Sequence, residues 1–385
     1  MSTVTDETSP LAAALAGLPR VVDLLAARAE EHDRDAAFPY QGIEAVHEAG
    51  LLTLTVGRRY GGPGGALSDT VRVLAELGRG DASVALVTAF TLLFHAEQAR
   101  TALWPTGGYR RLLGESRRGP ALVNTLWVEP AEGPATLARR DGDGWLLTGR
   151  KTCCTGAEAL AWMVVRARTD EPRPRTGSFL VRGESEGVEV DPVWDQLGLR
   201  ASAGHDVLFR DVYVPAEAAL GLQGEEDPEA AALTAAWRDL ALAAVQLGVG
   251  RAAQDWLVRF LSQRTPANLG DTLGDLPRYR CALGGMESAL IGAEELLAGL
   301  AARIDAGDEL AVERTGAVQL LATRAVIDSV QQAVALTGSP GLSRRHPLER
   351  YLRDALSGRM HCPSEEAVLE VAGQRALARF RPRGA

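Results

Sequence analysis

The stretch of sequence that decides the fold begins with TGRKTCCTGA at residues 148–157 and ends with VLFRDVYVP at residues 207–215. Just before it, DGDG at residues 141–144 is a tight-turn sequence between two runs with strand character, 135–139 and 145–151. In the final run apolar residues recur at strand spacing, and the closing proline lacks the backbone N–H that strand pairing needs. These patterns predict a small β-domain.

Helical sequence lies on both sides of this β-domain. On the N-terminal side we expect helices at 68–80 and 82–98, and the second is apolar nearly all round, which is typical of a buried helix. His95 lies at the end of its most apolar part. On the C-terminal side the patterns are typical of a helical bundle and cover 229–263, 277–304, 309–337, 347–361 and a shorter stretch at 364–378.

Composition narrows the class of protein. The 385 residues are 46% hydrophobic and 24% charged, as in ordinary globular proteins of two or three domains. The net charge of -9 argues against nucleic acid as a partner. No basic segment followed by an apolar run opens the sequence, and the apolar run at 84–94 is short for a membrane span. We therefore expect a cytoplasmic protein without a membrane partner.

Cysteine usage gives no sign of a disulfide framework or of a metal site. The four cysteines include an adjacent pair, Cys153 and Cys154, and their spacing matches no metal-ligand pattern. We expect no metal.

The motifs G-R-K-x-x-x-T-G-A, L-G-L-R-A-S and F-R-D-V-Y-V-P, set between two helical blocks, resemble those of the acyl-CoA dehydrogenase superfamily, which includes a branch of flavin-dependent monooxygenases. The resemblance covers nearly the whole chain. It implies an α+β multidomain fold with an N-terminal α-helical domain (1–118), a middle β-barrel-like domain (119–223) and a C-terminal four-helix bundle (224–385). It also implies a homo-oligomer, a dimer or a tetramer.

The same resemblance implies a flavin, normally FAD, bound between the β-domain and the bundle. The flavin contacts that it transfers to this chain are Leu126, Trp127, Val128, Cys153 and Thr155, then Arg264, Gly338, Ser339 and Gly341 toward the flavin of a neighbouring subunit, and Ser364. One departure concerns residues 129–135, which read EPAEGPA and lack the serine that binds the pyrophosphate in the family. FMN is therefore an alternative cofactor.

A dehydrogenase of this superfamily needs a carboxylate base. The commonest position lies nine residues after the arginine of an R-D pair, here Arg353, and is Cys362; the second family position falls at Arg238, with Asp239 beside it. Neither position holds a glutamate. A thiol near a helix C-terminus has a raised pKa and is a poor base, whereas the same field favours protonated His361 as a general acid.

The monooxygenase branch instead tends to carry hydrogen-bond donors at the positions of His361, His95 and Thr155. Donors in a site without water suit the chemistry of reduced flavin and oxygen. The candidate catalytic residues are therefore His361, His95, Thr155 and Cys362, acting on a small organic substrate, with reduced flavin supplied by a separate reductase.

Other interpretations stay open. His95 is also typical of a core histidine that is satisfied by a neighbour. A dehydrogenase for acyl-CoA or acyl-carrier-protein thioesters, with Asp239 or Glu365 as a displaced base, fits the whole-chain resemblance. A flavoprotein-fold binding subunit without catalysis fits the altered pyrophosphate turn.

Overall fold

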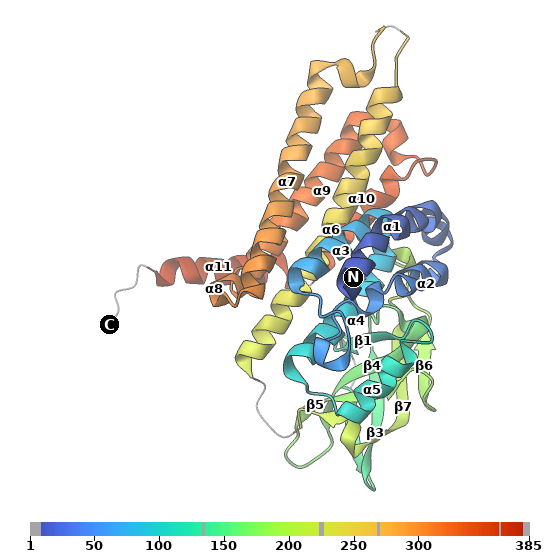
Figure 1. Ribbon diagram of the computed structural model, residues 1–385, viewed down its shortest axis with the longest axis vertical. Coiled ribbons are helices and arrows are strands. Elements are labelled where there is room, and N and C mark those ends of the chain that lie inside the picture. The colour runs from blue at the N-terminus through green and yellow to red at the C-terminus, as the bar shows by residue number, and fades with distance from the viewer. Residues whose placement is uncertain (1–8, 133–134, 223–226, 268–269, 362, 380–385) are drawn as a thin grey trace, which may run out of the picture. The chain divides into compact units, whose positions relative to one another are not determined.

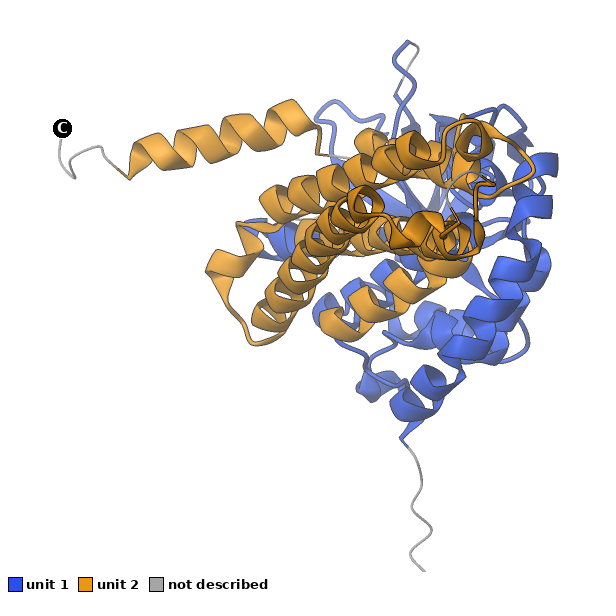
Figure 2. Ribbon diagram, turned by 90° about the horizontal axis from the view of Figure 1, so that it is seen from above, with its two compact units in different colours: residues 1–66, 83–196, 200–234 blue, residues 67–82, 197–199, 235–385 orange. Residues whose placement is uncertain are grey.

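The computed structural model describes residues 9–132, 135–222, 227–267, 270–361 and 363–379. The chain divides into two compact units that do not follow its order. Unit 1 holds residues 1–66, 83–196 and 200–234, and unit 2 holds residues 67–82, 197–199 and 235–385 (Figure 2). The predicted domain boundaries after residues 118 and 223 stay a prediction.

Unit 1 contains helices packed with one sheet (Figure 1). Its helices are α1 (Pro10–Asp35), α2 (Tyr40–Glu48), α4 (Ala82–Thr101) and α5 (Thr106–Glu115). The hydroxyl of Ser9 accepts a hydrogen bond from the Ala12 N–H and caps α1. Helix α4 is buried on most sides, as its sequence predicts.

By length and composition alone, α1 and α4 could each cross a membrane, which is weak evidence because buried core helices pass the same test. Most of the apolar window of α4 is buried inside the protein, whereas most of that of α1 is not. The expected absence of a membrane partner stays a prediction.

The sheet of unit 1 has eight strands. They are β1 (Leu122–Leu126), β2 (Leu137–Asp141), β3 (Gly144–Lys151), β4 (Leu160–Thr169), β5 (Thr176–Arg182), β6 (Val188–Asp191), β7 (Asp206–Pro215) and β8 (Ala219–Leu220). Their order is β6-β7-β3-β2-β4-β5-β8, and β1 pairs in parallel with β4. The predicted turn is confirmed: β2 and β3 form an antiparallel hairpin in which Asp141 faces Gly144 and Gly142 has a φ of 53°.

Unit 2 is helical. It holds α3 (Leu67–Gly80), most of α6 (Pro228–Gln263), α7 (Pro277–Asp305), α8 (Glu309–Val312), α9 (Thr315–Thr337), α10 (Leu348–Ser357) and α11 (Glu365–Ala378). Helices α7 and α9 run side by side (Figure 1). Short 3₁₀ turns complete both units at Leu51–Thr53, Arg58–Tyr60, Ala157–Ala159, Arg200–Ser202, Ala216–Ala218, Leu273–Asp275, Ser339–Leu342 and Gly358–Met360.

Two predicted helices of the bundle are shorter than expected. The prediction of a single helix at 309–337 is wrong, because the helix is broken between α8 and α9. At this break the Thr315 hydroxyl donates a hydrogen bond to the Val312 carbonyl at 3.0 Å. The helix at 347–361 ends at Ser357 and continues as a 3₁₀ turn. A Cβ added at Gly358 in that turn would lie 3.1 Å from Gln246 and from Thr323, so the turn packs tightly against α6 and α9.

Helices α3 and α6 cross closely in unit 2. A Cβ at Gly248 would lie 2.2 Å from the Ala75 carbonyl oxygen, and one at Gly78 would lie 2.5 Å from the Val245 carbonyl oxygen. Both distances are shorter than real Cβ contacts, and the atoms they meet are backbone, which cannot rotate away. Glycine is therefore required on both helices for this approach.

We predict that Gly248→Ala lowers the free energy of unfolding by roughly 1–3 kcal/mol, because the helices must separate. The matched control is Gly299→Ala on α7, where a Cβ meets nothing within 4 Å and helix propensity favours alanine by up to about 1 kcal/mol. Urea unfolding of both variants measures the difference. Equal stability of the two variants would contradict the close crossing.

Candidate active site

The end of β1 and the end of β3 lie together in unit 1. The Thr152 N–H donates to the Val128 carbonyl at 3.0 Å, and the Asn124 side-chain amide donates to the Thr155 carbonyl at 3.0 Å. These bonds bring the predicted flavin contacts Leu126–Val128 into one place with Cys153 and Thr155. Trp127 and Val128 are exposed there, whereas Thr155 is buried.

Backbone hydrogen bonds to residues 202–205 hold the loop that carries Cys153 and Thr155. The N–H groups of Cys154, Gly156 and Ala157 donate to the carbonyls of His205, Ser202 and Ala203 at 2.9, 2.8 and 3.1 Å, respectively. Cys153 itself has a φ of 54°, an uncommon backbone conformation for a residue with a side chain. Cys153 is an exposed residue of this loop, and the incomplete hydration of its thiol raises the pKa of the thiol.

An ion pair between a buried lysine and a partly exposed glutamate links the same two strand ends. The ammonium of Lys151, which is 1% exposed, pairs with the Glu129 carboxylate, which also accepts bonds from the Thr136 N–H and hydroxyl at 3.2 Å. Burial lowers the pKa of Lys151, and the Glu129 carboxylate opposes that shift. The charge thus persists in the interior because it is paired.

His205 was given no role by the sequence, yet it joins two loops of this region. Its Nδ1 accepts the Trp194 N–H at 3.0 Å, so its proton lies on Nε2, which meets the Glu158 carboxylate at 2.9 Å. The Trp194 ring would meet a Cβ at Gly204 at 2.7 Å. His205 therefore positions the backbone that supports Thr155.

Helix α4 places His95 against β1. One turn before His95, the Thr91 hydroxyl accepts the Val123 N–H at 3.1 Å. His95 has no exposed surface, and its Nδ1 lies 2.8 Å from the Tyr109 hydroxyl oxygen. Burial lowers the pKa of His95 to about 3, so its imidazole is neutral at physiological pH.

Several buried polar atoms in this region have no hydrogen-bond partner within the described part of the chain. They are Thr88 Oγ1, His95 Nε2, Asn124 Oδ1 and Ser202 Oγ. Buried polar groups without partners are rare in folded proteins, and they gather where a ligand or water completes them. Each of them is a place where a polar atom of a cofactor, a substrate or a water molecule fits.

Unit 2 holds a second polar cluster, around Asp239 on α6. The Asp239 carboxylate is 5% exposed and pairs with Arg238 at 3.2 Å, while the Thr315 hydroxyl lies at 3.5 Å. Burial raises the pKa of Asp239, although Arg238 and Thr315 oppose the shift.

The prediction of a protonated His361 is wrong. His361 follows a 3₁₀ turn instead of ending an α-helix, and burial together with the nearby positive charge of Arg238 lowers its pKa to about 4. Its Nε2 is buried without a partner among the described residues. A neutral imidazole at this place can donate a hydrogen bond but is not a ready general acid.

The other predicted residues of unit 2 lie at element ends. Arg264 is exposed after α6, Gly338 follows α9 with a φ of 64°, and Ser339 and Gly341 lie in the next 3₁₀ turn. The Ser364 hydroxyl accepts the Ala367 N–H at 3.3 Å and caps α11. Cys362 lies outside the described residues. The flavin contacts assigned to these residues stay predictions.

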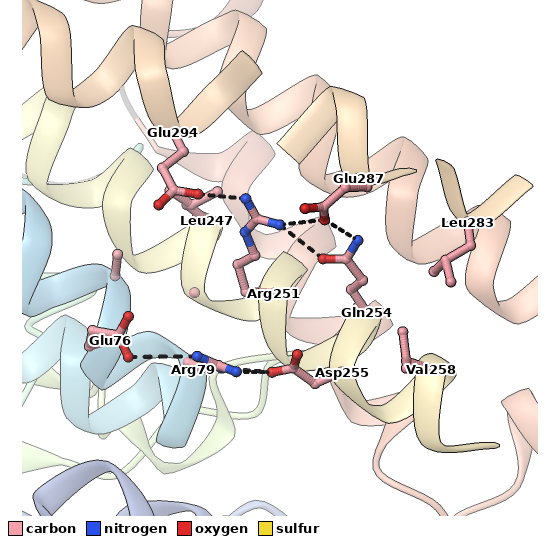
Figure 3. A pocket seen from close by; sticks show the side chains of 12 residues that line it. Glu76, Arg79, Leu247, Arg251, Gln254, Asp255, Val258, Leu283, Glu287 and Glu294 are labelled. Atoms are coloured by element: carbon pink, nitrogen blue, oxygen red, sulfur yellow. Dashed lines mark hydrogen bonds and ion pairs between the residues drawn. The ribbon is translucent and has the colours of Figure 1, made fainter. Parts of the chain in front are cut away.

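A cavity of about 530 Å³ in unit 2 lies among α3, α6 and α7, and none of the residues that line it is a predicted site residue (Figure 3). Its charges are paired within it: Arg79 contacts Asp255 at 2.5 Å, and Arg251 contacts Glu287 at 2.8 Å and Glu294 at 2.5 Å. Across the described ranges, no group of three or more His, Cys, Asp or Glu could hold a metal ion.

Known proteins match most of this chain. The family models for the N-terminal, middle and C-terminal domains of acyl-CoA dehydrogenase match residues 21–99, 129–212 and 240–365, respectively. The putative acyl-CoA dehydrogenase YdbM of Bacillus subtilis (strain 168) is 29% identical over 370 residues, which are 93% of this chain and 95% of YdbM.

Solved structures share the fold. KijD3 in complex with FMN and dTDP-3-amino-2,3,6-trideoxy-4-keto-3-methyl-D-glucose has a TM-score of 0.83 and 26% identity, over 98% of each chain. Dibenzothiophene monooxygenase (TdsC) from Paenibacillus sp. A11-2 has a TM-score of 0.83 at 21% identity, over 96% of this chain and 98% of TdsC, and it shows the fold alone.

Burial of neutral His95 predicts a loss of stability in acid. The folded-state pKa of about 3 lies below the ordinary 6.5, so as the pH falls below 6.5 the unfolded chain binds a proton that the folded chain does not. The stabilisation is complete above about pH 6.5 and is lost progressively toward pH 3.

Between about pH 7 and about pH 5, His95 should account for a loss of roughly 2 kcal/mol in unfolding free energy. Urea unfolding at both pH values, in wild type and in His95→Gln, measures it. The variant should lose correspondingly less on acidification, and an identical loss in both proteins would refute the assignment.

Proposed function

Because this chain belongs to the acyl-CoA dehydrogenase superfamily, whose members are flavin-dependent dehydrogenases and monooxygenases, we propose that it is a monooxygenase-like enzyme. It uses reduced flavin and oxygen to oxidise a small organic substrate.

The observation that carries the proposal is the neutral, buried imidazole of His95 in unit 1, whose Nε2 atom has no partner within the described ranges. In unit 2, taken by itself, the partly exposed His361 also has a lowered pKa and a buried Nε2 atom without a partner among the described residues. Neutral imidazoles offer hydrogen bonds without adding a charge, which suits an oxygen atom that gains negative character in a dry site. Neither position where the superfamily places its catalytic carboxylate holds a glutamate in this chain.

Bound flavin would supply the redox chemistry. In unit 1 the backbone of Leu126–Val128, with Cys153 and Thr155, would contact its ring, and the Thr155 hydroxyl would offer a hydrogen bond. The altered turn at 129–135 favours FMN over FAD, and the FMN in the KijD3 complex supports that possibility. KijD3 binds an amino-sugar nucleotide, which supports the proposal that this protein also acts on a small polar substrate.

The proposal extends to partners. Arg264 is exposed just after the end of α6. We propose that it reaches the flavin of a second subunit in a homo-oligomer, together with Gly338, Ser339 and Gly341. A separate reductase would deliver reduced flavin, and the protein would act in the cytoplasm.

The test is rapid mixing of photoreduced, flavin-loaded protein with oxygenated buffer, followed by visible absorbance. We expect the absorbance of oxidised flavin to return after a delay that free flavin does not show. Thr155→Val should shorten that delay by roughly tenfold to a hundredfold, because one hydrogen-bond donor is lost.

The matched control for this test is Thr148→Val on β3, which removes an exposed hydroxyl that donates to Asp211 on the neighbouring strand β7 and should leave the delay unchanged. Immediate return of oxidised flavin in the wild type would contradict the proposal. Failure to retain either FAD or FMN would favour a binding subunit without catalysis.

One observation favours the alternative of a dehydrogenase with a displaced base. Buried Asp239 has a raised pKa, as a carboxylate that takes a proton from carbon needs. The other candidate, Glu365, is half exposed and pairs with Arg324, so the structure favours it less than Asp239.

Asp239→Asn separates the two functions. If the enzyme is a dehydrogenase, anaerobic reduction of the flavin by acyl-CoA thioesters should fall by roughly 100-fold or more, and Glu365→Gln should change little. If it is a monooxygenase, thioesters reduce the flavin in neither the wild type nor the variants. Flavin content and thermal midpoint of each variant exclude a folding defect as the cause.

A further inference from the structure

The hydrogen bond between His95 and Tyr109 determines which nitrogen of the imidazole carries the proton. The two atoms that meet are Nδ1 of His95 on α4 and the hydroxyl oxygen of Tyr109 on α5, at 2.8 Å. Both side chains are essentially without exposed surface. An aromatic cluster of Tyr60, Phe94 and Trp104 encloses them, with the Tyr60 and Tyr109 rings 4.7 Å apart.

Both groups have a single protonation state near neutrality. Burial lowers the pKa of His95 to about 3 and raises the pKa of Tyr109 above its ordinary value of 10. The imidazole is therefore neutral and the phenol keeps its proton. Only the position of one proton, on Nδ1 or on Nε2, is left to decide.

The two arrangements differ in how many polar groups they leave unsatisfied. If His95 donates from Nδ1, the Tyr109 O–H has no acceptor among the described residues, and Nε2 is a buried acceptor without a donor. If Tyr109 donates to Nδ1, the only unsatisfied group is the Nε2–H. One fewer unsatisfied buried group corresponds to a roughly 5- to 150-fold preference.

We propose that Tyr109 is a positioning residue that holds His95 as the Nε2–H tautomer, so that the imidazole is a permanent hydrogen-bond donor at the junction of α4 and β1. The chemical partner of that donor is an acceptor atom, a carbonyl oxygen or an oxygen anion, on the flavin or the substrate. This identification of the partner rests on the proposed function; the assignment of the tautomer does not.

Neighbouring contacts set Tyr109 apart from the other phenol of the cluster. The Tyr60 hydroxyl accepts a hydrogen bond from the Gln98 side-chain amide at 3.2 Å and does not contact His95. Tyr60→Phe thus removes a hydroxyl from the same cluster without touching the imidazole. It is the matched control for Tyr109→Phe, because both changes keep the ring.

The test is two-bond proton–nitrogen correlation spectroscopy of the flavin-free full-length protein labelled with ¹⁵N at histidine. The His95 signals are identified by their loss in His95→Gln. We expect the wild type and Tyr60→Phe to show a protonated Nε2 and an unprotonated, hydrogen-bonded Nδ1. In Tyr109→Phe we expect the preference for that tautomer to fall at least fivefold.

Either of two results would overturn the inference: a wild-type protein with the proton on Nδ1, or a Tyr109→Phe variant with the wild-type tautomer. The first needs no variant, so it holds even if Tyr109→Phe folds poorly.

Failure of the proposed function is distinguishable. The oxygen reaction of the reduced, flavin-loaded variants is measured separately. A tautomer that changes in Tyr109→Phe while the oxygen reaction stays as in wild type supports the role of Tyr109 and counts against the proposed monooxygenase chemistry.

Discussion

The arrangement of the candidate site depends on one ion pair, between buried Lys151 at the end of β3 and partly exposed Glu129 just after β1. Lys151 is the single lysine of the chain and is 1% exposed, so its charge would be costly without a partner. The pair holds together the ends of β1 and β3, which are not adjacent in the sequence. The bond from Thr152 to Val128 and the bond from Asn124 to Thr155 then follow from that approach.

Burial is the largest cause of the pKa shifts of His95, His361 and Asp239. His95 and His361 have lowered pKa values of about 3 and about 4 because the charged form loses its water, and Asp239 has a raised pKa for the same reason. Burial thus shifts each group toward its neutral form. In unit 1, the neutral donor His95 fits the oxygen chemistry that we propose.

Sequence patterns predicted those helices and turns whose own residues show a helical periodicity or a turn motif. The turn at 141–144 followed from its glycines and aspartates, and the long helices α6 and α7 from apolar periodicity, almost to the residue. The break at 313–314 and the 3₁₀ turn after α10 were missed, because tertiary contacts of Thr315 and Gly358 override a continuous helical pattern. Tyr109, Asn124 and Ser202 were also missed, since each lies far in sequence from the residues that it meets.

The sequence by itself determined the superfamily, the order of helical and β-segments and the residue types at the candidate positions, because periodicity and motifs are local properties. Only the tertiary structure decided the chemical state of those residues. The sequence predicted that His361 is protonated, whereas its pKa is lowered in the structure. The reason is that its pKa depends on burial and on Arg238, which lies on another helix. The tautomer of His95 likewise depends on a phenol from α5, which no pattern along α4 reveals.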